Sequence, residues 1–273
     1  MERILSTRNV SVNFRDHAVL RGVSAEFPSG SMTAVIGSNG AGKTTYLKAI
    51  AGMVRSAGEI LFTEDGKRIS VRDSIAYVPQ LGSVHTRLTA YEMVLLGLVR
   101  NLKWHVTREQ RAQVYETLEE LNIADIAGQP FNTLSGGQRQ LVYMGQSFIG
   151  RPKVLLLDEP TSALDLRHQL IVMDLAERYT RSQNAVTVFV VHDLLLASRY
   201  GRNLLVLKDG KTRAFGSAGQ ILTSGLIEEV YGVKARVERL PEGYLNVIPV
   251  SPILKECGAG PRTGAFRKHL PPA

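Results

Sequence analysis

Hydrophobic residues in this chain fall into short runs separated by polar turns, which is typical of an α/β protein. Strand-like runs rich in Val, Thr and Ile occupy residues 4–13 and 31–36. Residues 153–160 (KVLLLDEP) and 185–193 (AVTVFVVHD) are continuous apolar runs with polar ends, as expected of buried parallel strands. Residues 203–216 contain an Asp-Gly pair that predicts a hairpin, and we expect a helix and short strands after it.

Two other stretches have the spacing of helices. Residues 44–53 place apolar side chains at helical intervals directly after a glycine-rich loop. Residues 106–125 form an amphipathic pattern, in which Thr107 and Gln110 resemble an N-cap and its capping-box partner. The sequence therefore predicts that a helical segment interrupts the α/β pattern.

Composition and charge are those of an ordinary folded domain. Of the 273 residues, 44% are hydrophobic and 21% are charged. The net charge of +8 is spread along the chain and is compatible with nucleic acid, an anionic membrane surface or a phosphate-rich ligand. The sequence contains no long apolar run and no signal-like N-terminus, so we expect a cytoplasmic protein. An ordered domain over residues 1–250 and a flexible tail over 251–273 are expected.

The stretch GSNGAGKTT matches the phosphate-loop pattern GxxxxGK[ST]. Glycines let backbone N–H groups approach phosphate oxygens, and the helix that follows adds the positive end of its dipole. Lys43 would neutralise the β and γ phosphates, and the Thr44 hydroxyl could coordinate Mg²⁺. The candidate phosphate-binding residues are Gly37, Ser38, Asn39, Gly40, Ala41, Gly42, Lys43, Thr44 and Thr45.

Asp158 and Glu159 follow a buried strand, where unpaired carboxylates are costly unless a cation or a reacting water uses them. We assign Asp158 to Mg²⁺, directly or through water, and Glu159 to the attacking water as general base. The alternative is that both acids cap the next helix. His192 could contact the γ phosphate and this water if the two strand ends are neighbours, whereas a lone histidine is usually structural. Gln80, in YVPQ, has only a weak case, because a loop glutamine is ordinarily just solvated.

A second glycine-bearing loop, LSGGQRQ at residues 134–140, leads into another helix. Its N–H groups and the helix dipole predict a second anion site. A plain glycine turn is the alternative. One chain would then contain two phosphate-binding elements.

These motifs, in this order over residues 1–249, resemble those of the ATP-binding-cassette (ABC) ATPases, the nucleotide-binding subunits of transporters. The resemblance implies the P-loop NTPase fold: a RecA-like core, an N-terminal antiparallel β subdomain and a helical signature subdomain at about residues 82–150. It also implies ATP and Mg²⁺ as cofactors. Two copies would pair head to tail, with each ATP between the phosphate loop of one copy and the LSGGQRQ loop, called the signature loop, of the other.

The resemblance also implies roles for single residues. Thr44, Gln80 and Asp158 would hold the metal, and Gln80 would also sense the γ phosphate and couple to the membrane subunit. Glu159 and His192 would serve hydrolysis. The residues that would close on nucleotide from the partner copy, or between the two sites, are Ser135, Gly136, Gly137, Gln138 and Asp165. Phe14 falls where the family has an aromatic ring that stacks on adenine, although it could instead be a core side chain.

Several stretches, among them LTAYEMVLLGLVR, LDLRHQL and ILTSGLIEEVYGV, are similar to the branch that imports siderophores, haem and vitamin B12. This resemblance implies a homodimeric ATPase on the cytoplasmic face of the membrane. Its partners would be permease subunits and, through them, a periplasmic or lipoprotein substrate-binding protein. The segment from Gln80 to about Leu98 is the expected permease-docking surface. Its apolar residues include Leu81, Val84, Leu88 and Tyr91.

Two alternatives remain open from the sequence. The cargo could be zinc or manganese in place of an iron chelate. The chain could also be a soluble cassette protein that acts on nucleic acid or ribosomes, which its net charge of +8 permits. Such proteins typically have two cassettes or a long coiled-coil insertion. We therefore expect no nucleic-acid partner.

Overall fold

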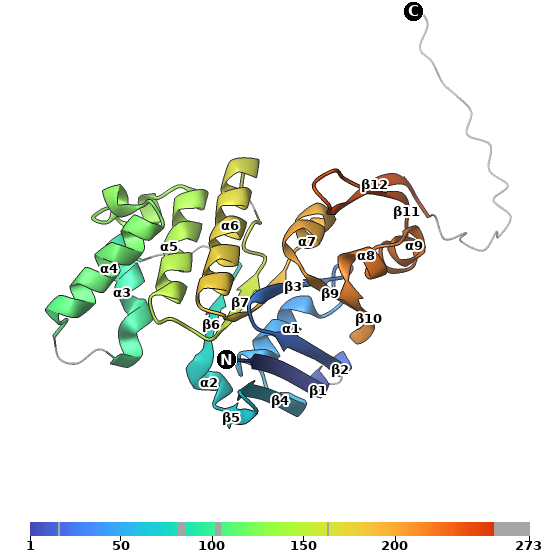
Figure 1. The fold of residues 1–273 in the computed structure, drawn as a ribbon, viewed down its shortest axis with the longest axis horizontal. Helices are drawn as coiled ribbons and strands as arrows, with labels where there is room; N and C mark the ends of the chain where they lie inside the picture. The colour runs from blue at the N-terminus through green and yellow to red at the C-terminus, as the bar shows by residue number, and fades with distance from the viewer. Residues whose placement is uncertain (16, 81–85, 102–104, 163, 254–273) are drawn as a thin grey trace, which may run out of the picture.

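A central six-stranded sheet, an N-terminal antiparallel sheet and a group of helices make up the fold (Figure 1). The computed structural model describes residues 1–253 except 16, 81–85, 102–104 and 163. The helix group lies beyond one edge of the central sheet, and a C-terminal hairpin lies on the opposite side of the molecule.

The central sheet has the strand order β10-β9-β3-β8-β7-β6, and all neighbours are parallel except β9 and β10. Every residue of β3, β7 and β8 is buried, as the continuous apolar runs predicted. The strands are β3 (Ser31–Ile36), β6 (Ile75–Val78), β7 (Val154–Asp158), β8 (Val186–Val190), β9 (Asn203–Lys208) and β10 (Lys211–Ser217).

The predicted hairpin is β9–β10. Asp209 and Gly210 join its strands with φ values of 50° and 75°. Two successive left-handed residues match the twist of an antiparallel pair, which is why Asp-Gly is favoured there. The prediction from residues 203–216 is confirmed.

The N-terminal sheet has the order β2-β1-β4-β5 and is antiparallel throughout. The strand predicted at residues 4–13 is confirmed as β1, with one more residue at each end. Leu5, Val10 and Val12 of this strand are buried against the core that also holds helix α1. The elements are β1 (Arg3–Phe14), β2 (His17–Pro28), β4 (Ala57–Glu64), β5 (Lys67–Ile69) and α1 (Lys43–Ile50).

Helices and short turns fill the chain between β6 and β7. The predicted capping box of α4 is present: Thr107 N donates to Gln110 Oε1 (3.0 Å), and Gln110 N donates to Thr107 Oγ1 (3.2 Å). The helix ends earlier than the predicted residue 125, because Asn122 adopts a left-handed φ of 55°. Helix α2 (Val71–Ser74) precedes β6; the elements after β6 are α3 (Ala90–Leu95), η1 (Leu96–Asn101), α4 (Arg108–Glu120), η2 (Ala124–Ile126), η3 (Phe131–Thr133) and α5 (Gly136–Phe148).

Alternate side chains of the central strands enter two separate cores. In β7, Val154 and Leu156 join the core with α1, whereas Leu155 and Leu157 join the core with the helices of the other face. A helix and short strands follow the β9–β10 hairpin, as expected. The remaining elements are α6 (Leu166–Ser182), α7 (Leu194–Tyr200), α8 (Ala218–Ile221), α9 (Ser224–Tyr231), β11 (Val233–Arg239) and β12 (Leu245–Pro252).

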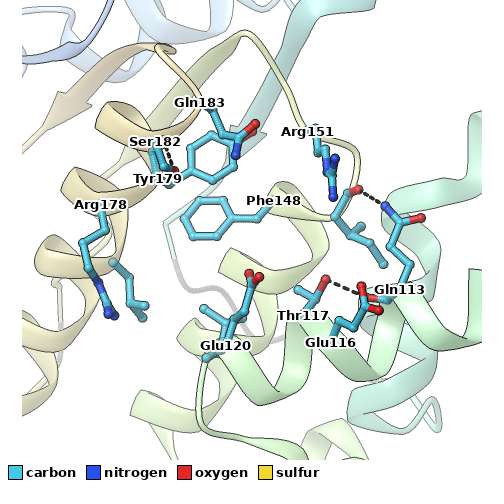
Figure 2. Close-up of a pocket in the computed structure, with 13 residues that line it drawn as sticks. Gln113, Glu116, Thr117, Glu120, Phe148, Arg151, Arg178, Tyr179, Ser182 and Gln183 are labelled. Atoms are coloured by element: carbon cyan, nitrogen blue, oxygen red, sulfur yellow. Dashed lines mark hydrogen bonds between the residues drawn. The ribbon is translucent and has the colours of Figure 1, made fainter.

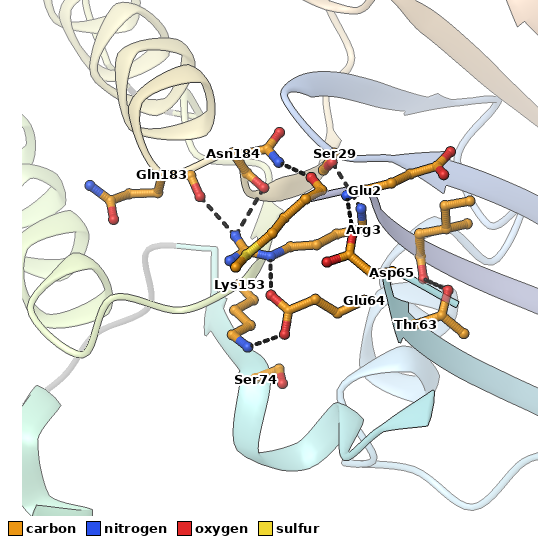
Figure 3. Close-up of polar contacts among 12 residues, drawn as sticks. Glu2, Arg3, Ser29, Thr63, Glu64, Asp65, Ser74, Lys153, Gln183 and Asn184 are labelled. Atoms are coloured by element: carbon orange, nitrogen blue, oxygen red, sulfur yellow. Dashed lines mark hydrogen bonds and ion pairs between the residues drawn. The ribbon is translucent and has the colours of Figure 1, made fainter. Parts of the chain in front are cut away.

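A polar cluster fastens the N-terminal sheet to the central sheet (Figure 3). Glu64 accepts from Arg3 Nε at 2.7 Å and from Lys153 Nζ at 2.6 Å. Arg3 Nη1 also donates to the backbone carbonyl of Gln183 at 2.8 Å. These bonds lower the pKa of the Glu64 carboxyl. The cluster joins β1 and β4 to the start of β7 and the end of α6.

Candidate functional site

The sequence motifs meet at the carboxyl edge of the central sheet. Because β3, β7 and β8 run parallel and side by side, the loops that follow them lie together. A cavity of about 410 Å³ opens there. Its lining residues are Val19, Asn39, Gly40, Gly42, Lys43, Thr44, Thr45, Glu159 and His192.

The phosphate loop leaves β3 and opens α1 at Lys43. Gly42, just before the helix, has a φ of 97°, and a Cβ atom there would lie 2.6 Å from Leu20 Cδ2. Both the backbone angle and the space therefore require glycine. Lys43 is only 6% exposed, and its ammonium donates to the carbonyls of Gly37 (2.9 Å) and Ser38 (3.0 Å). Burial lowers its pKa, and the nearby Glu159 and Asp158 carboxylates oppose this effect.

Asp158 is buried and has a donor for each carboxylate oxygen. Thr44 Oγ1 donates to Oδ1 at 2.9 Å, and the Tyr77 hydroxyl donates to Oδ2 at 2.7 Å. Sequence reasoning assigned both Thr44 and Asp158 to Mg²⁺ but missed Tyr77. The only available cue was the place of Tyr77 on the strand that leads to Gln80.

Glu159 brings three of the predicted residues together. Its Oε2 accepts from Gln80 Nε2 at 2.8 Å, and its Oε1 lies 2.7 Å from His192 Nε2. The condition set for His192 is met, because β7 and β8 are neighbours. The Glu159 backbone has a φ of 51°, which is uncommon for a residue with a side chain of this size. The Glu159 carboxylate is therefore held between the Gln80 and His192 side chains, an arrangement suited to a general base.

The signature loop caps helix α5. Ser135 N donates to Gln138 Oε1 at 2.9 Å, and Gln138 N donates to Ser135 Oγ at 3.2 Å. Gly136 and Gly137 form the first two positions of the helix. The signature residues do not line the phosphate-loop cavity within the described chain. The structure therefore places the two predicted anion sites apart on one molecule.

Asp165 is the N-cap of α6. Its Oδ1 accepts from the backbone N–H of His168 at 2.9 Å, and both carboxylate oxygens lie within 2.9 Å of His168 Nδ1. These bonds lower the pKa of Asp165. The alternative that Asp158 and Glu159 cap this helix is wrong, because Asp165 does so. The His168 ring also packs against Gly137 of the signature helix, a contact that sequence reasoning missed.

Phe14 lies at the end of β1 and is half exposed (50%), so the alternative of a core phenylalanine is wrong.

In the expected docking segment, Leu81 and Val84 lie outside the described residues. Leu88 and Tyr91 are partly buried and pack against the larger core. The docking role of this segment stays a prediction.

The residues present fit a Mg²⁺ ion. Thr44 and Asp158 offer hydroxyl and carboxylate oxygens 2.9 Å apart, and such hard donors suit this metal. Among the described residues, no group of three or more His, Cys, Asp or Glu side chains could hold a metal by itself. This agrees with an ion that takes its other ligands from phosphate oxygens and water.

A second cavity, of about 550 Å³, lies away from the phosphate loop, among α4, the end of α5 and α6 (Figure 2). The rings of Phe148 and Tyr179 stack in it at 4.3 Å with an angle of 10°. Acidic residues of α4 and basic residues of the other two segments surround the stack. None of the predicted site residues lines this cavity.

Comparisons with known proteins agree with this geometry. The family model described as ABC transporter matches residues 20–162. A hemin import ATP-binding protein of Streptomyces coelicolor is 34% identical over 256 residues, covering 91% of this chain and 90% of the relative. An iron(3+)-hydroxamate import ATP-binding protein of Bacillus subtilis is 32% identical over 241 residues, covering 85% of this chain and 89% of the relative.

A solved structure of an inward-facing ABC transporter, assigned to the metal-chelate type, has a TM-score of 0.80 and 28% identity. The match covers 92% of this chain and 98% of that one. No helix in the described part of the chain is long and apolar enough to cross a membrane. The fold class and the family resemblance expected from the sequence are confirmed. The chain belongs to the ABC transporter family, as one of its ATP-binding ATPases.

Proposed function

We propose that this chain is the ATP-hydrolysing subunit of an importer for iron chelates of the siderophore, haem or cobalamin type. The observation that supports hydrolysis is Glu159, held between Gln80 and His192 beside the phosphate loop. The names of the hemin and iron(3+)-hydroxamate import relatives support the cargo class.

In this proposal the phosphate loop binds the β and γ phosphates through its backbone N–H groups and Lys43. Thr44 and Asp158 would hold Mg²⁺, with the side-chain amide oxygen of Gln80 as a further ligand. The ion neutralises phosphate charge when bound. Glu159 accepts a proton from the attacking water, and His192 fixes the Glu159 carboxylate and contacts the γ phosphate.

The second anion site belongs to a second copy of the chain. We infer that Ser135, Gly136, Gly137 and Gln138 bind the γ phosphate of nucleotide on the partner copy, and that Asp165 lies between the two sites. Two observations support this arrangement: the capping box is exposed, and its residues are not among those that line the phosphate-loop cavity on one molecule. The exposed Phe14 ring would stack on adenine. Closure of the dimer on two ATP molecules is then the mechanical step.

Closure would drive permease subunits, docked on the segment from Gln80 to about Leu98. The chain would act at the cytoplasmic face of the membrane, and the permease would connect it to a substrate-binding protein. The position of Gln80 supports this coupling, since it contacts Glu159 and is the first residue of the docking segment. In domain terms, residues 1–250 are the ATPase and residues 82–150 contain its helical part, although the last strand, β12, runs two residues past this boundary to Pro252.

The decisive experiment is ATP-dependent dimerisation of the Glu159→Gln variant, followed by size-exclusion chromatography with light scattering. The substitution removes the base and keeps the shape of the side chain, so we expect a trapped dimer in ATP and loss of hydrolysis. Glu26→Gln, on the exposed face of β2, is the control and should behave as the parent. A Glu159→Gln monomer that still hydrolyses ATP would refute the proposal.

The cargo is tested separately in cells that lack this chain. We expect them to lose growth on ferric siderophore or haem as the sole iron source, and to recover it when the chain is returned. Growth loss only under zinc or manganese limitation would instead assign the cargo to those metals.

A further inference from the structure

Strand β6 supplies a donor to each of the two adjacent carboxylates at the end of β7. The Tyr77 hydroxyl donates to Asp158 Oδ2 at 2.7 Å, and three residues later Gln80 Nε2 donates to Glu159 Oε2 at 2.8 Å. The two strands are parallel neighbours, and Tyr77 lies opposite Leu156. Its side chain therefore reaches forward along β7 to the carboxyl edge.

The hydroxyl of Tyr77 is a firm donor to this carboxylate. A carboxylate can only accept hydrogen bonds, so the phenol O–H is the donor in this pair. Asp158 is only 2% exposed, so its carboxylate depends on protein donors for most of its hydrogen bonds. A bond of this length between a hydroxyl and a charged acceptor is among the stronger hydrogen bonds of proteins.

The two donors to Asp158 differ in what else they do. Thr44, on Oδ1, is itself a candidate metal ligand, so its hydroxyl has a second task. Tyr77, on Oδ2, is not a metal-ligand candidate. Its bond occupies Oδ2, so Oδ1 and the Thr44 hydroxyl are the oxygens that would hold a metal.

We propose that Tyr77 is a positioning residue that orients the Asp158 carboxylate for the Mg²⁺ ion of Mg²⁺–ATP. This inference rests on the proposed function and deepens it. Strand β6 would then link the docking segment to both carboxylates. Tyr77 contacts Asp158, the proposed metal ligand, and Gln80 contacts Glu159, the proposed base. ATP without metal should not depend on this link.

A substitution at Tyr77 can separate the positioning role of its hydroxyl from the packing of its ring. It is partly buried against the core that holds α1, so Tyr77→Phe keeps the ring and removes only the hydroxyl. A matched control exists in Tyr200, whose hydroxyl donates to Asp174 Oδ1 at 2.6 Å in another part of the fold. Tyr200→Phe loses the same kind of bond without touching the site.

The experiment measures ATP binding by calorimetry to the full chain, in EDTA and in Mg²⁺, for the parent and both variants. For Tyr77→Phe we expect unchanged affinity in EDTA and an affinity gain from Mg²⁺ that is about 10-fold smaller, the scale of one hydrogen bond to a charged group. The Mg²⁺ concentration for half-maximal hydrolysis should rise by a similar factor. Tyr200→Phe should match the parent in all three measurements.

Two results would overturn the inference: parental Mg²⁺ dependence in Tyr77→Phe, or an equal loss of affinity in EDTA and in Mg²⁺. A coupling test separates a specific effect on Asp158 from a general effect of Tyr77→Phe on the fold. In an Asp158→Asn background, the same change should have no further effect on Mg²⁺ dependence, and a full additive effect would also refute the role. Active Glu159→Gln would instead overturn the proposed function, whatever Tyr77→Phe shows.

Discussion

Gly137 gives the sharpest test of how the start of helix α5 packs against α6. A Cβ atom on this residue would lie 2.7 Å from Cγ and 2.8 Å from Nε2 of the His168 ring. These distances are well inside the optimal separation of about 3.5–4.0 Å for carbon atoms. The ring cannot simply turn away, because Asp165 holds Nδ1 at 2.8 Å. Gly137→Ala must therefore shift the ring, the cap or the helix.

The size of the effect follows from two opposing terms. Overpacking costs about 1–3 kcal/mol, and alanine is favoured over glycine in a helix by up to about 1 kcal/mol. We therefore expect Gly137→Ala to lower the free energy of unfolding by about 0–2 kcal/mol. Gly225 is the matched control, since it is also the second residue of its helix and a Cβ atom there meets nothing within 4 Å. Gly225→Ala should stabilise slightly.

Urea unfolding followed by circular dichroism measures both variants. The same pair of substitutions is repeated in a His168→Ala background, where the ring is gone. There Gly137→Ala should become as favourable as Gly225→Ala, so the two backgrounds should differ by about 1–3 kcal/mol. If Gly137→Ala changes the free energy of unfolding by the same amount in both backgrounds, the proposed steric contact is wrong.

Three further predictions follow from contacts described above. Glu64→Gln should lower the melting temperature at pH 7, because the bonds from Arg3 and Lys153 lower the pKa of this carboxyl. A depressed carboxyl pKa stabilises above the ordinary value of 4.5, so the difference between parent and variant should shrink as the pH falls below it; a difference independent of pH would contradict the argument. Lys43→Ala should weaken ATP binding in calorimetry by a factor of about 10–100, the value of hydrogen bonds to a charged group, and parental affinity would remove Lys43 from the site. Phe14→Ala should cost about 0.5–1.5 kcal/mol of ATP affinity, Phe14→Tyr should cost nothing, and an equal loss for tripolyphosphate would exclude adenine stacking.

Much of the central sheet was predictable because its signals are local. Every residue of β3, β7 and β8 is buried, so their apolar runs are unbroken in the sequence. The Asp-Gly hairpin and the capping box of α4 also depend on a few adjacent residues. The phosphate loop could be recognised for the same reason, since its glycines and lysine are contiguous.

Contacts between distant segments had no such signal. The Tyr77 hydroxyl reaches Asp158 across 81 positions of sequence, and the position of one tyrosine in a short strand does not reveal its partner. The His168–Gly137 contact depends on how α5 and α6 pack, which no single motif encodes. Asp158 and Glu159 do not cap α6, because this helix begins later in the chain, with Asp165 as its N-cap.

At position 159, the residue that ATP hydrolysis requires is not the residue that would make the fold most stable, because the backbone there is left-handed. A φ of 51° costs a residue with a Cβ atom about 1–2 kcal/mol, whereas glycine pays nothing and asparagine pays less. A library randomised at residue 159 and selected for thermal stability alone should therefore enrich Gly and Asn. Those clones would have exchanged ATP turnover for a more durable fold, and Glu159→Gln, which retains the strain, would not be among them.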